Sequence, residues 1–492
     1  MERVRQVLPQ QSLAADENLL ARLDRAPMTR TVWMIVGLLM LAWLVEAFDI
    51  GIIGAGLLFL KPAWHLTPDQ AGLLGSSGTL GIVLGLLPAG RMADAYGRKR
   101  VLATGIVVFS VFTMAGALAG NIEQLAVLRF LAGLGEGAVF PVPYLLISEF
   151  VNKRRRGEAV GWANFVLTTA YMLPSLVGVL VVRAGLGDAG WRVLFGLGGL
   201  PLLIAPVIAF LLPESPRFLL KAGHSAEVRA LVERIEDEAG LPHDASLTNE
   251  AALNVLEATA HRRVGLATLL QPPYLLRCFV AFCALGSPFV IFYTTTIYGP
   301  TIFHLMGASS SNALLYIAGL QFVSGIGTIA GGMLGDRIGR RPTHVAFMLL
   351  AGVALILLGR SLPTPLLVAT AAAAWFFGVG NFAVPKLYMA EQFPTRLRAT
   401  GSAVGEVVTR VLFGVVLAYY IPTLLAQFTV RTVFVMLGIS MVALVLPILF
   451  LGNETAGRSV EETGTDLSST SVEHRTIVGA GAPGGVGKHP LP

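Results

Sequence analysis

The chain has 492 residues, of which 54% are hydrophobic and only 13% are charged, and its formal net charge is +6. A soluble domain carries about a quarter charged residues, so this composition excludes an ordinary soluble protein and indicates a membrane protein. The excess positive charge requires no nucleic-acid partner, because loops of membrane proteins on the cytoplasmic side are rich in Lys and Arg. Cys278 and Cys283 are the only cysteines and lie in one apolar segment, so no disulfide framework or metal site is expected.

Residues 1–30 are polar and lack the apolar region of a cleavable signal peptide, so we expect a cytoplasmic N-terminal segment. Twelve apolar runs of about 20 residues follow, each long enough to cross a hydrocarbon core of about 30 Å. We expect the spans to begin near Val32, Gln70, Val101, Ile122, Glu158, Trp191, Leu275, Asn312, Thr343, Pro365, Gly401 and Thr432. The predicted fold is therefore an all-α membrane protein.

Polar segments divide these spans. We expect residues 31–212 to form a six-helix N-terminal half and residues 274–452 a six-helix C-terminal half, joined by a cytoplasmic loop with amphipathic helices, 213–273. In that loop the sequence SAEVRALVERIEDEAG predicts a surface helix, with Ser225 as its N-cap and Gly240 as its stop. Residues 453–492 are rich in Gly, Ser, Thr and Pro, which predicts a disordered tail. Basic residues are concentrated after spans 2, 4, 8 and 10, which predicts that both termini are cytoplasmic.

A charged motif occurs twice. GRMADAYGRKR, at 90–100, matches GGMLGDRIGRR, at 331–341, so that Asp94 and Asp336 lie 242 residues apart; Glu149 and Glu391 have the same offset. A single copy would be explained by a solvated loop, but two motifs at one offset indicate a duplicated six-span unit with pseudo-symmetric halves, a known transporter architecture. We expect the charges to hold the two halves together at the cytoplasmic mouth. The candidate gating residues are Gly90, Asp94, Gly97, Arg98, Glu149, Arg156, Asp336, Gly339, Arg340, Glu391 and Arg398.

These motifs resemble the loop signatures of the major facilitator superfamily. Further stretches resemble its sugar-porter signatures: RFLAGLGEG (129–137), PESPRFLL (213–220), EQFPTRLRATG (391–401) and NETAGRSVEE (453–462). The opening ARLDRAPMTRTVWM, followed by EAFDIGIIGAG, is more similar to bacterial metabolite:proton symporters, the group that includes nicotinate and aromatic-acid carriers. The resemblance covers nearly the whole chain except the tail and implies a secondary transporter of the bacterial inner membrane.

Two departures from the signatures of related families narrow the range of possible substrates. The region ALGSPFVIFYTTTIYGPTIF lacks the amide side chains with which hexose porters bind sugar hydroxyls, and YMLPSLVGVL lacks the Gly-Pro signature of drug:proton antiporters. A sugar or polyol:proton symporter remains the alternative, because PESPRFLL and NETAGRSVEE are sugar-porter-like. No nucleotide-binding motif, cofactor site or catalytic constellation is recognisable, so neither an enzyme nor a primary pump is expected. A non-transporting sensor on the same fold would be expected to carry a folded extension, and the short, featureless tail argues against this alternative.

Ionisable side chains at mid-membrane depth cost about 2.5–3.5 kcal/mol each on insertion scales, so each requires a partner or a function. Glu46 and Asp49, three residues apart, share a helix face. In the families resembled, an acid of span 1 binds the proton and an Arg of span 4 faces it. Asp49 and Arg129 occupy these positions, so Asp49 is the expected proton carrier, with Glu46 as the alternative. A purely structural role remains open for Asp49 and Arg129.

Arg129 and Arg410 offer cationic partners for an anion, which favours a small organic acid as substrate; alternatively, Glu406 and Arg410 neutralise each other at their i, i+4 spacing. The candidate substrate-binding residues are Arg129, Glu136, Asn164, Tyr171, Tyr293, Tyr298, Gln321, Trp375, Asn381 and Arg410, with Trp162 as a further aromatic candidate. We therefore predict a monomeric symporter that moves a small carboxylate together with protons by alternating access.

Overall fold

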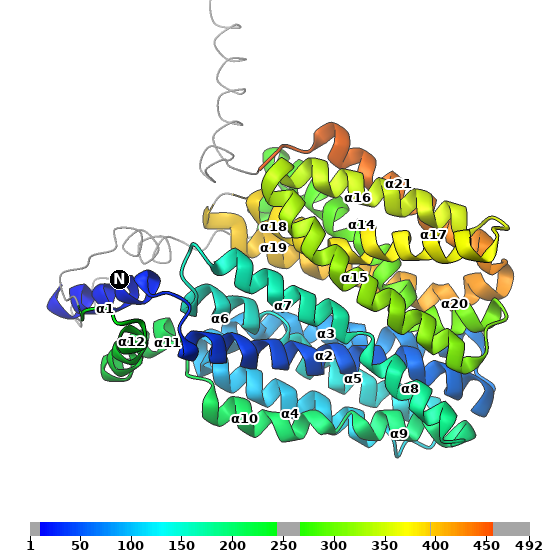
Figure 1. Ribbon diagram of the computed structural model, residues 1–492, viewed down its shortest axis with the longest axis horizontal. Helices are drawn as coiled ribbons and strands as arrows, with labels where there is room; N and C mark the ends of the chain where they lie inside the picture. The colour runs from blue at the N-terminus through cyan, green and yellow to red at the C-terminus, as the bar shows by residue number, and fades with distance from the viewer. Residues whose placement is uncertain (1–9, 244–265, 394, 456–492) are drawn as a thin grey trace, which may run out of the picture.

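The computed structural model describes residues 10–243, 266–393 and 395–455, which fold into helices without a β-strand in these ranges (Figure 1). The predicted disorder of the tail from residue 456 and any further amphipathic helix within 244–265 lie outside the described residues. Within these described ranges, twelve helical segments are long and apolar enough to cross a membrane, which confirms the predicted fold class. Their starts agree with the expected ones to within about four residues; the helices mostly begin earlier, because they continue through polar residues at the membrane surface.

The spans of the first half are α2 (Arg30–Ala63), α3 (Pro68–Tyr96), α4 (Arg98–Gly116), α5 with α6 (Ile122–Val139, Val142–Phe150), α7 with α8 (Arg156–Ala170, Leu173–Arg183), and the segment Gly187–Leu211 with α9 (Gly190–Leu197) and α10 (Ile204–Leu211). The spans of the second half are α14 (Pro272–Leu305), α15 (Ser310–Ile338), α16 (Arg340–Leu358), α17 with α18 (Thr364–Phe377, Ala383–Glu391), α19, η6 and α20 (Thr395–Thr409, Arg410–Leu417, Ala418–Gln427), and α21 (Val430–Leu451).

The duplication is visible in local structure. Thr67 caps the N-terminus of α3 by accepting a hydrogen bond from the amide of Gln70, and Ser309 caps α15 in the same way through Asn312. Such side-chain caps satisfy one of the free amides at a helix start. Spans 4 and 10 are both interrupted, the latter by the 3-10 turn η5 (Val379–Asn381).

The molecule has two ends, which Figure 1 separates from left to right. The end with α1 (Gln10–Arg25), α11 (Pro216–Lys221) and α12 (Ser225–Ala239) also carries both charged motifs and is called the charged end below; the other is called the far end. The predicted surface helix is confirmed as α12, with Gly240 as a left-handed stop (φ 65°). Ser225 is its first helical residue and His224 is the cap, so the predicted N-cap was wrong by one position.

At the far end the two halves pack backbone to backbone. A Cβ atom on Gly54 of α2 would lie 2.1 Å from the carbonyl oxygen of Thr296 on α14, and one on Gly72 of α3 would lie 2.1 Å from that of Tyr419 on α20. Small residues allow such close helix approach in membranes. The far end is therefore closed in this conformation.

Candidate functional site

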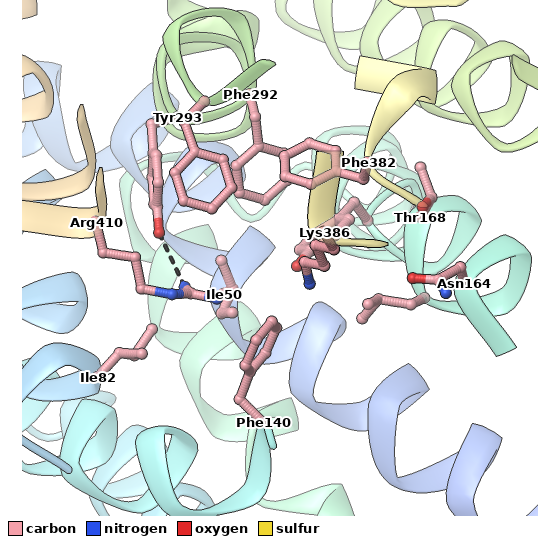
Figure 2. A pocket seen from close by; sticks show the side chains of 13 residues that line it. Ile50, Ile82, Phe140, Asn164, Thr168, Phe292, Tyr293, Phe382, Lys386 and Arg410 are labelled. Atoms are coloured by element: carbon pink, nitrogen blue, oxygen red, sulfur yellow. Dashed lines mark hydrogen bonds between the residues drawn. The ribbon is translucent and has the colours of Figure 1, made fainter. Parts of the chain in front are cut away.

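The central cavity lies between the two halves and receives side chains from both (Figure 2). Its lining residues are Ile50, Ile82, Phe140, Asn164, Leu167, Thr168 and Tyr171 of the first half, and Phe289, Phe292, Tyr293, Phe382, Lys386 and Arg410 of the second. Its volume is about 30 Å³, whereas one water requires about 10–15 Å³ measured in this way. A ring-sized ligand would therefore require the halves to move apart.

One wall of the cavity is aromatic. The rings of Phe289 and Phe382 lie 5.3 Å apart, those of Phe292 and Phe382 5.0 Å apart, and those of Phe289 and Tyr293 5.2 Å apart. Figure 2 shows the rings of Phe292, Tyr293 and Phe382 on the side of the cavity opposite Phe140. These separations are those of favourable ring contacts, so the wall presents π-faces and edges to anything bound beside it.

Arg410 projects into the cavity from the start of η6, a π-helical segment within span 11. Its side chain donates to Glu406 at 2.9 Å and to the hydroxyl of Tyr293 at 2.9 Å, and its guanidinium lies 4.2 Å from the ring centroid of Phe140. The expected neutralisation of Arg410 by Glu406 is present, with a second contact of 2.8 Å. π-Helical turns occur frequently at functional sites, and here the turn places the arginine at the cavity.

Lys386, on α18, is a second cation of the cavity, and the sequence-based reasoning missed it. Its Nζ lies 4.3 Å from the ring centroid of Phe140 and 3.3 Å from the hydroxyl of Tyr144. The Tyr144 hydroxyl in turn donates to the amide oxygen of Asn164 at 2.7 Å. Within the described parts of the chain, no carboxylate lies within 4.0 Å of Lys386. A lone Lys inside an otherwise apolar span was the available signal.

An acidic cluster lies beside the cavity. Arg129 on α5 donates to Asp49 on α2 at 2.7 Å and to the hydroxyl of Thr113 at 3.1 Å, and it lies 3.6 Å from Glu136. The predicted approach of Asp49 to Arg129 is therefore present. Glu46 is fully buried, and both its carboxyl oxygens lack a hydrogen-bond partner within the residues described. Four acids and three bases thus occupy the interior near the cavity, once Glu406, Arg410 and Lys386 are included.

Of the ten predicted substrate-binding residues, Asn164, Tyr171, Tyr293 and Arg410 line the central cavity. Arg129 and Glu136 line a smaller neighbouring cavity instead. Gln321 is buried against Thr296, and Trp162 is 47% exposed on the outer surface, so neither faces the central cavity.

The remaining predicted residues have other surroundings. The Tyr298 hydroxyl lies 2.7 Å from the carbonyl oxygen of Ala418, at the far end. The side-chain amide of Asn381 forms a hydrogen bond of 3.0 Å with the ring of His344. Trp375 is buried but does not line the central cavity. Hydropathy and residue type place these side chains inside the protein but do not specify which face of each helix they occupy.

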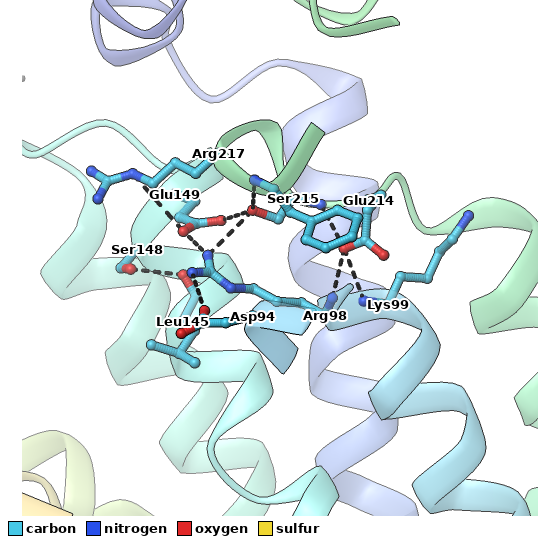
Figure 3. A network of polar contacts seen from close by, with 10 residues as sticks. Asp94, Arg98, Lys99, Leu145, Ser148, Glu149, Glu214, Ser215 and Arg217 are labelled. Carbon is cyan, nitrogen blue, oxygen red and sulfur yellow. Dashed lines mark hydrogen bonds and ion pairs between the residues drawn. The ribbon is translucent and has the colours of Figure 1, made fainter. Parts of the chain in front are cut away.

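The first charged motif forms a network around Arg98, at the charged end (Figure 3). Arg98 forms an ion pair with Glu149, and Glu149 also accepts a hydrogen bond of 2.5 Å from Ser215. Glu214 accepts from the backbone amide of Arg98 at 2.8 Å and from that of Lys99 at 3.1 Å. Glu214 therefore caps the N-terminus of α4, where a negative charge is favourable.

The second motif repeats this arrangement. Arg340 forms ion pairs with Asp336 and, at 3.8 Å, with Glu391, and the latter accepts a hydrogen bond of 2.5 Å from Thr455. Glu454 accepts from the backbone amide of Arg340 at 2.9 Å. The capping glutamates Glu214 and Glu454 were not predicted, although each stands in a stretch recognised as sugar-porter-like.

Glycine is required where each motif turns into the next helix. Gly97 has φ 97° and Gly339 has φ 110°, conformations that other residues rarely adopt. By contrast, a Cβ on Gly90 would contact nothing within 4 Å, so close packing does not require a glycine at this position.

The expectation that the charged motifs hold the two halves together is also wrong for this conformation. Among the described residues, the ion pairs of Arg98 stay within the first half and those of Arg340 within the second. Arg156 donates to the backbone oxygen of Val151 at 3.3 Å, and the Nε and Nη2 atoms of Arg398 have no partner among the residues described. Each motif instead joins the spans of its own half.

Comparisons with known proteins agree with this architecture. Residues 35–467 match the family described as "Sugar (and other) transporter". The chain is 28% identical to the niacin transporter NiaP of Acinetobacter baylyi, over 91% of this chain and 100% of that protein. It is 31% identical to the 4-hydroxybenzoate transporter PcaK of Pseudomonas aeruginosa, over 77% of this chain and 84% of that protein.

Among solved structures, the inward-open conformation of the xylose transporter XylE from E. coli is similar, with a TM-score of 0.73 and 18% identity over 88% of this chain and 99% of that chain. At this identity the similarity shows the fold alone. The family and these relatives are transporters rather than enzymes. The chain is thus a multi-pass membrane transporter with a small-molecule substrate, and it belongs to the sugar (and other) transporter family of the major facilitator superfamily.

Proposed function

We propose that this protein imports a small aromatic or nicotinate-like carboxylate together with protons, by alternating access. The observation that carries the proposal is the central cavity, in which an aromatic wall faces two cations, the partly buried Lys386 and the buried Arg410. A flat ring would pack against the wall, and its carboxylate would accept charge-assisted hydrogen bonds. The names of the niacin and 4-hydroxybenzoate relatives support the same substrate class.

The cavity offers little to a sugar. Its one amide side chain, Asn164, accepts from Tyr144 and donates to the backbone oxygen of Val160 at 2.8 Å. Sugar hydroxyls buried without partners would be strongly unfavourable, since each unmade hydrogen bond costs about 1–3 kcal/mol. We therefore propose that hexoses and polyols are not substrates.

The proposed transport cycle follows from the closed far end and the small cavity. The walls come from both halves, so separation of the halves at one end would enlarge the cavity and admit substrate there. Closure at that end and opening at the other would release it. The excess of acids over bases near the cavity supports proton coupling, because a net buried charge is costly inside a membrane.

The location proposed for the protein is a bacterial inner membrane. Concentration of Lys and Arg at the charged end supports a cytoplasmic position for that end and for both termini. Contacts between the halves close the far end without a second copy of the chain, which supports function as a monomer.

Uptake into proteoliposomes tests the proposal. Radiolabelled nicotinate, benzoate and 4-hydroxybenzoate should accumulate when the interior is alkaline, and a protonophore should abolish the accumulation. Glucose and xylose should remain at the level of protein-free liposomes. Saturable, protonophore-sensitive sugar uptake without carboxylate uptake would identify a sugar symporter instead.

A further inference from the structure

We infer that Lys386 binds the substrate carboxylate and that Glu46, which balances Lys386 in the absence of substrate, takes up one proton for each substrate bound. This inference rests on the proposed function, since it assigns roles within the same cavity. It differs from the expectation for this chain that Asp49 carries the proton and that arginines bind the anion.

The three cations near the cavity differ in whether a carboxylate already pairs with them. Arg129 is held by Asp49 at 2.7 Å, and Arg410 by Glu406 at 2.8 Å. Among the described residues, Lys386 makes a polar contact with the Tyr144 hydroxyl at 3.3 Å, and no carboxylate lies within 4.0 Å of it. An arginine would have to give up its carboxylate to accept a substrate anion, leaving a buried charge unpaired. Lys386 can accept the anion without breaking an ion pair.

Glu46 is the acid in the complementary situation. It lies on α2 in the first half, is fully buried, and has no described cation within 4.0 Å of either oxygen. Glu46 and Lys386 nevertheless interact electrostatically across the interface between the halves, although Arg410 acts more strongly on Glu46 and Glu406 more strongly on Lys386. The other ionisable groups that interact with Glu46 are Asp49, Glu136, Tyr144, Tyr171, Tyr293 and Arg410.

The balance of charges near the cavity predicts how many protons are taken up with each substrate. Arg410 and Glu406 neutralise each other, and Asp49 neutralises Arg129 when Glu136 is protonated. Ionised Glu46 then balances Lys386. A substrate carboxylate that pairs with Lys386 leaves Glu46 as an uncompensated charge, which a membrane interior disfavours. Protonation of Glu46 removes that charge, so each monovalent anion enters with one proton and transport is electroneutral.

Equilibrium binding to the purified full-length protein tests both assignments. Titration calorimetry with benzoate and with nicotinate, in two buffers of different ionisation enthalpy between pH 5.5 and 8, should give one proton absorbed per ligand. Binding and protonation are linked, so affinity should fall by about tenfold per pH unit at the alkaline end. Glu46→Gln should bind with pH-independent affinity and absorb no proton, while Asp49→Asn should still absorb one.

Lys386→Met should lose affinity for benzoate and nicotinate by about tenfold or more, the loss expected for a buried charge-assisted contact, but should keep its affinity for neutral benzamide and nicotinamide. The matched control is Lys221→Met, which removes an exposed lysine of α11. Lys386→Arg retains the charge and provides a folded reference in which carboxylate binding should persist.

The outcomes are distinguishable. Unchanged carboxylate affinity in Lys386→Met would overturn the assignment of Lys386. Proton uptake that persists in Glu46→Gln but disappears in Asp49→Asn would place the proton on Asp49 and overturn the assignment of Glu46. Wild-type protein that binds none of the carboxylates would overturn the proposed function itself, and this inference with it.

Discussion

The hydroxyl of Tyr298, on α14 of the second half, lies 3.3 Å from the carbonyl oxygen of Ala71, on α3 of the first half. The same hydroxyl lies 2.7 Å from the carbonyl oxygen of Ala418, so its single proton is shared between two acceptors. This contact crosses the interface at the far end, beside the backbone contacts of Gly54 and Gly72. It stabilises the conformation in which that end is closed.

Tyr298→Phe should favour opening of the far end. A neutral hydrogen bond contributes about 1 kcal/mol, so the open population should rise by about fivefold. Thiol labelling of Leu57→Cys, in a background without the native cysteines, measures this, since Leu57 lines a far-end cavity of about 250 Å³. Tyr316→Phe, at a half-exposed tyrosine, is the control. Equal labelling rates in the two variants would contradict the assignment.

Gly72→Ala should slow transport more than it weakens substrate binding. The added Cβ would lie 2.1 Å from a backbone oxygen of Tyr419, which cannot move aside as a side chain could. Overpacking of this kind costs about 1–3 kcal/mol, so turnover should fall by about tenfold or more. Gly37→Ala is the matched control because its Cβ would meet nothing within 4 Å. Parallel loss of binding and transport would argue against a closing defect.

Asp49→Asn and Glu136→Gln should be strongly non-additive in stability. Both acids lie close to Arg129, at 2.7 Å and 3.6 Å, so either one can compensate its charge when the other is replaced. The double variant leaves the arginine buried and unpaired, which costs about 3–5 kcal/mol. Thermal unfolding in detergent, analysed as a double-mutant cycle, measures the coupling. Additive shifts in Tm would show that the acids act independently.

Glu149→Gln should impair turnover far more than Asp94→Asn. The side chain of Asp94 is 68% exposed and lies 3.8 Å from Arg98, whereas that of Glu149 is 5% exposed and pairs with the same arginine. Exposed pairs contribute about 0–1 kcal/mol, and broken buried pairs cost about 3–5 kcal/mol. Exchange and net uptake in proteoliposomes, with binding measured separately, test the order. A larger effect at Asp94 would show that Asp94, and not Glu149, is the main partner of Arg98.

The attachment of α12 to α2 should weaken in acid. The hydroxyl of Thr31 donates to Glu238 at 2.5 Å and the amide of Thr31 donates at 2.8 Å, and these bonds hold the pKa of the Glu238 carboxyl below its ordinary value of 4.5. A lowered pKa stabilises the folded state above pH 4.5, and this contribution is lost as the pH falls through the folded pKa.

Pepsin cleavage of α12, normalised to a peptide of the same sequence, should therefore accelerate as the pH falls below 4.5. Thr31→Val removes the hydroxyl donor and should reduce this pH dependence. A pH dependence that Thr31→Val leaves intact would show that another group is responsible.

The sequence was sufficient for the spans, the surface helix α12 and the duplication, because these depend on local hydropathy and on spacing along the chain. The offset of 242 residues also showed that Arg98 and Arg340 have equivalent surroundings. It did not show which residues pair with them, and the pairing across the halves was wrong. Each copy of the charged motif forms its ion pairs and hydrogen bonds without residues of the other half, and each has its own capping glutamate.

The substrate site was predicted only in part. Arg410 and Tyr293 were recognised by residue type, but Lys386 and Phe140, which also line the cavity, were not. Tyr298 and Gln321 were assigned to the cavity although they lie on other faces of their helices. Which face meets the other half depends on packing between distant segments, and hydropathy within one span carries no such information.

Lys386 and Tyr144 stand 242 residues apart, the offset of the internal repeat, and their side chains touch. Equivalent positions of two related halves can meet only on the pseudo-twofold axis that relates them. A ligand held by Lys386 would thus lie on the centre line between the two halves, within reach of side chains from both. A perfectly symmetric ancestor would place two lysines or two tyrosines face to face here. One of each gives the ammonium an acceptor instead of a like charge, so the symmetry must be broken at the point where the two halves meet.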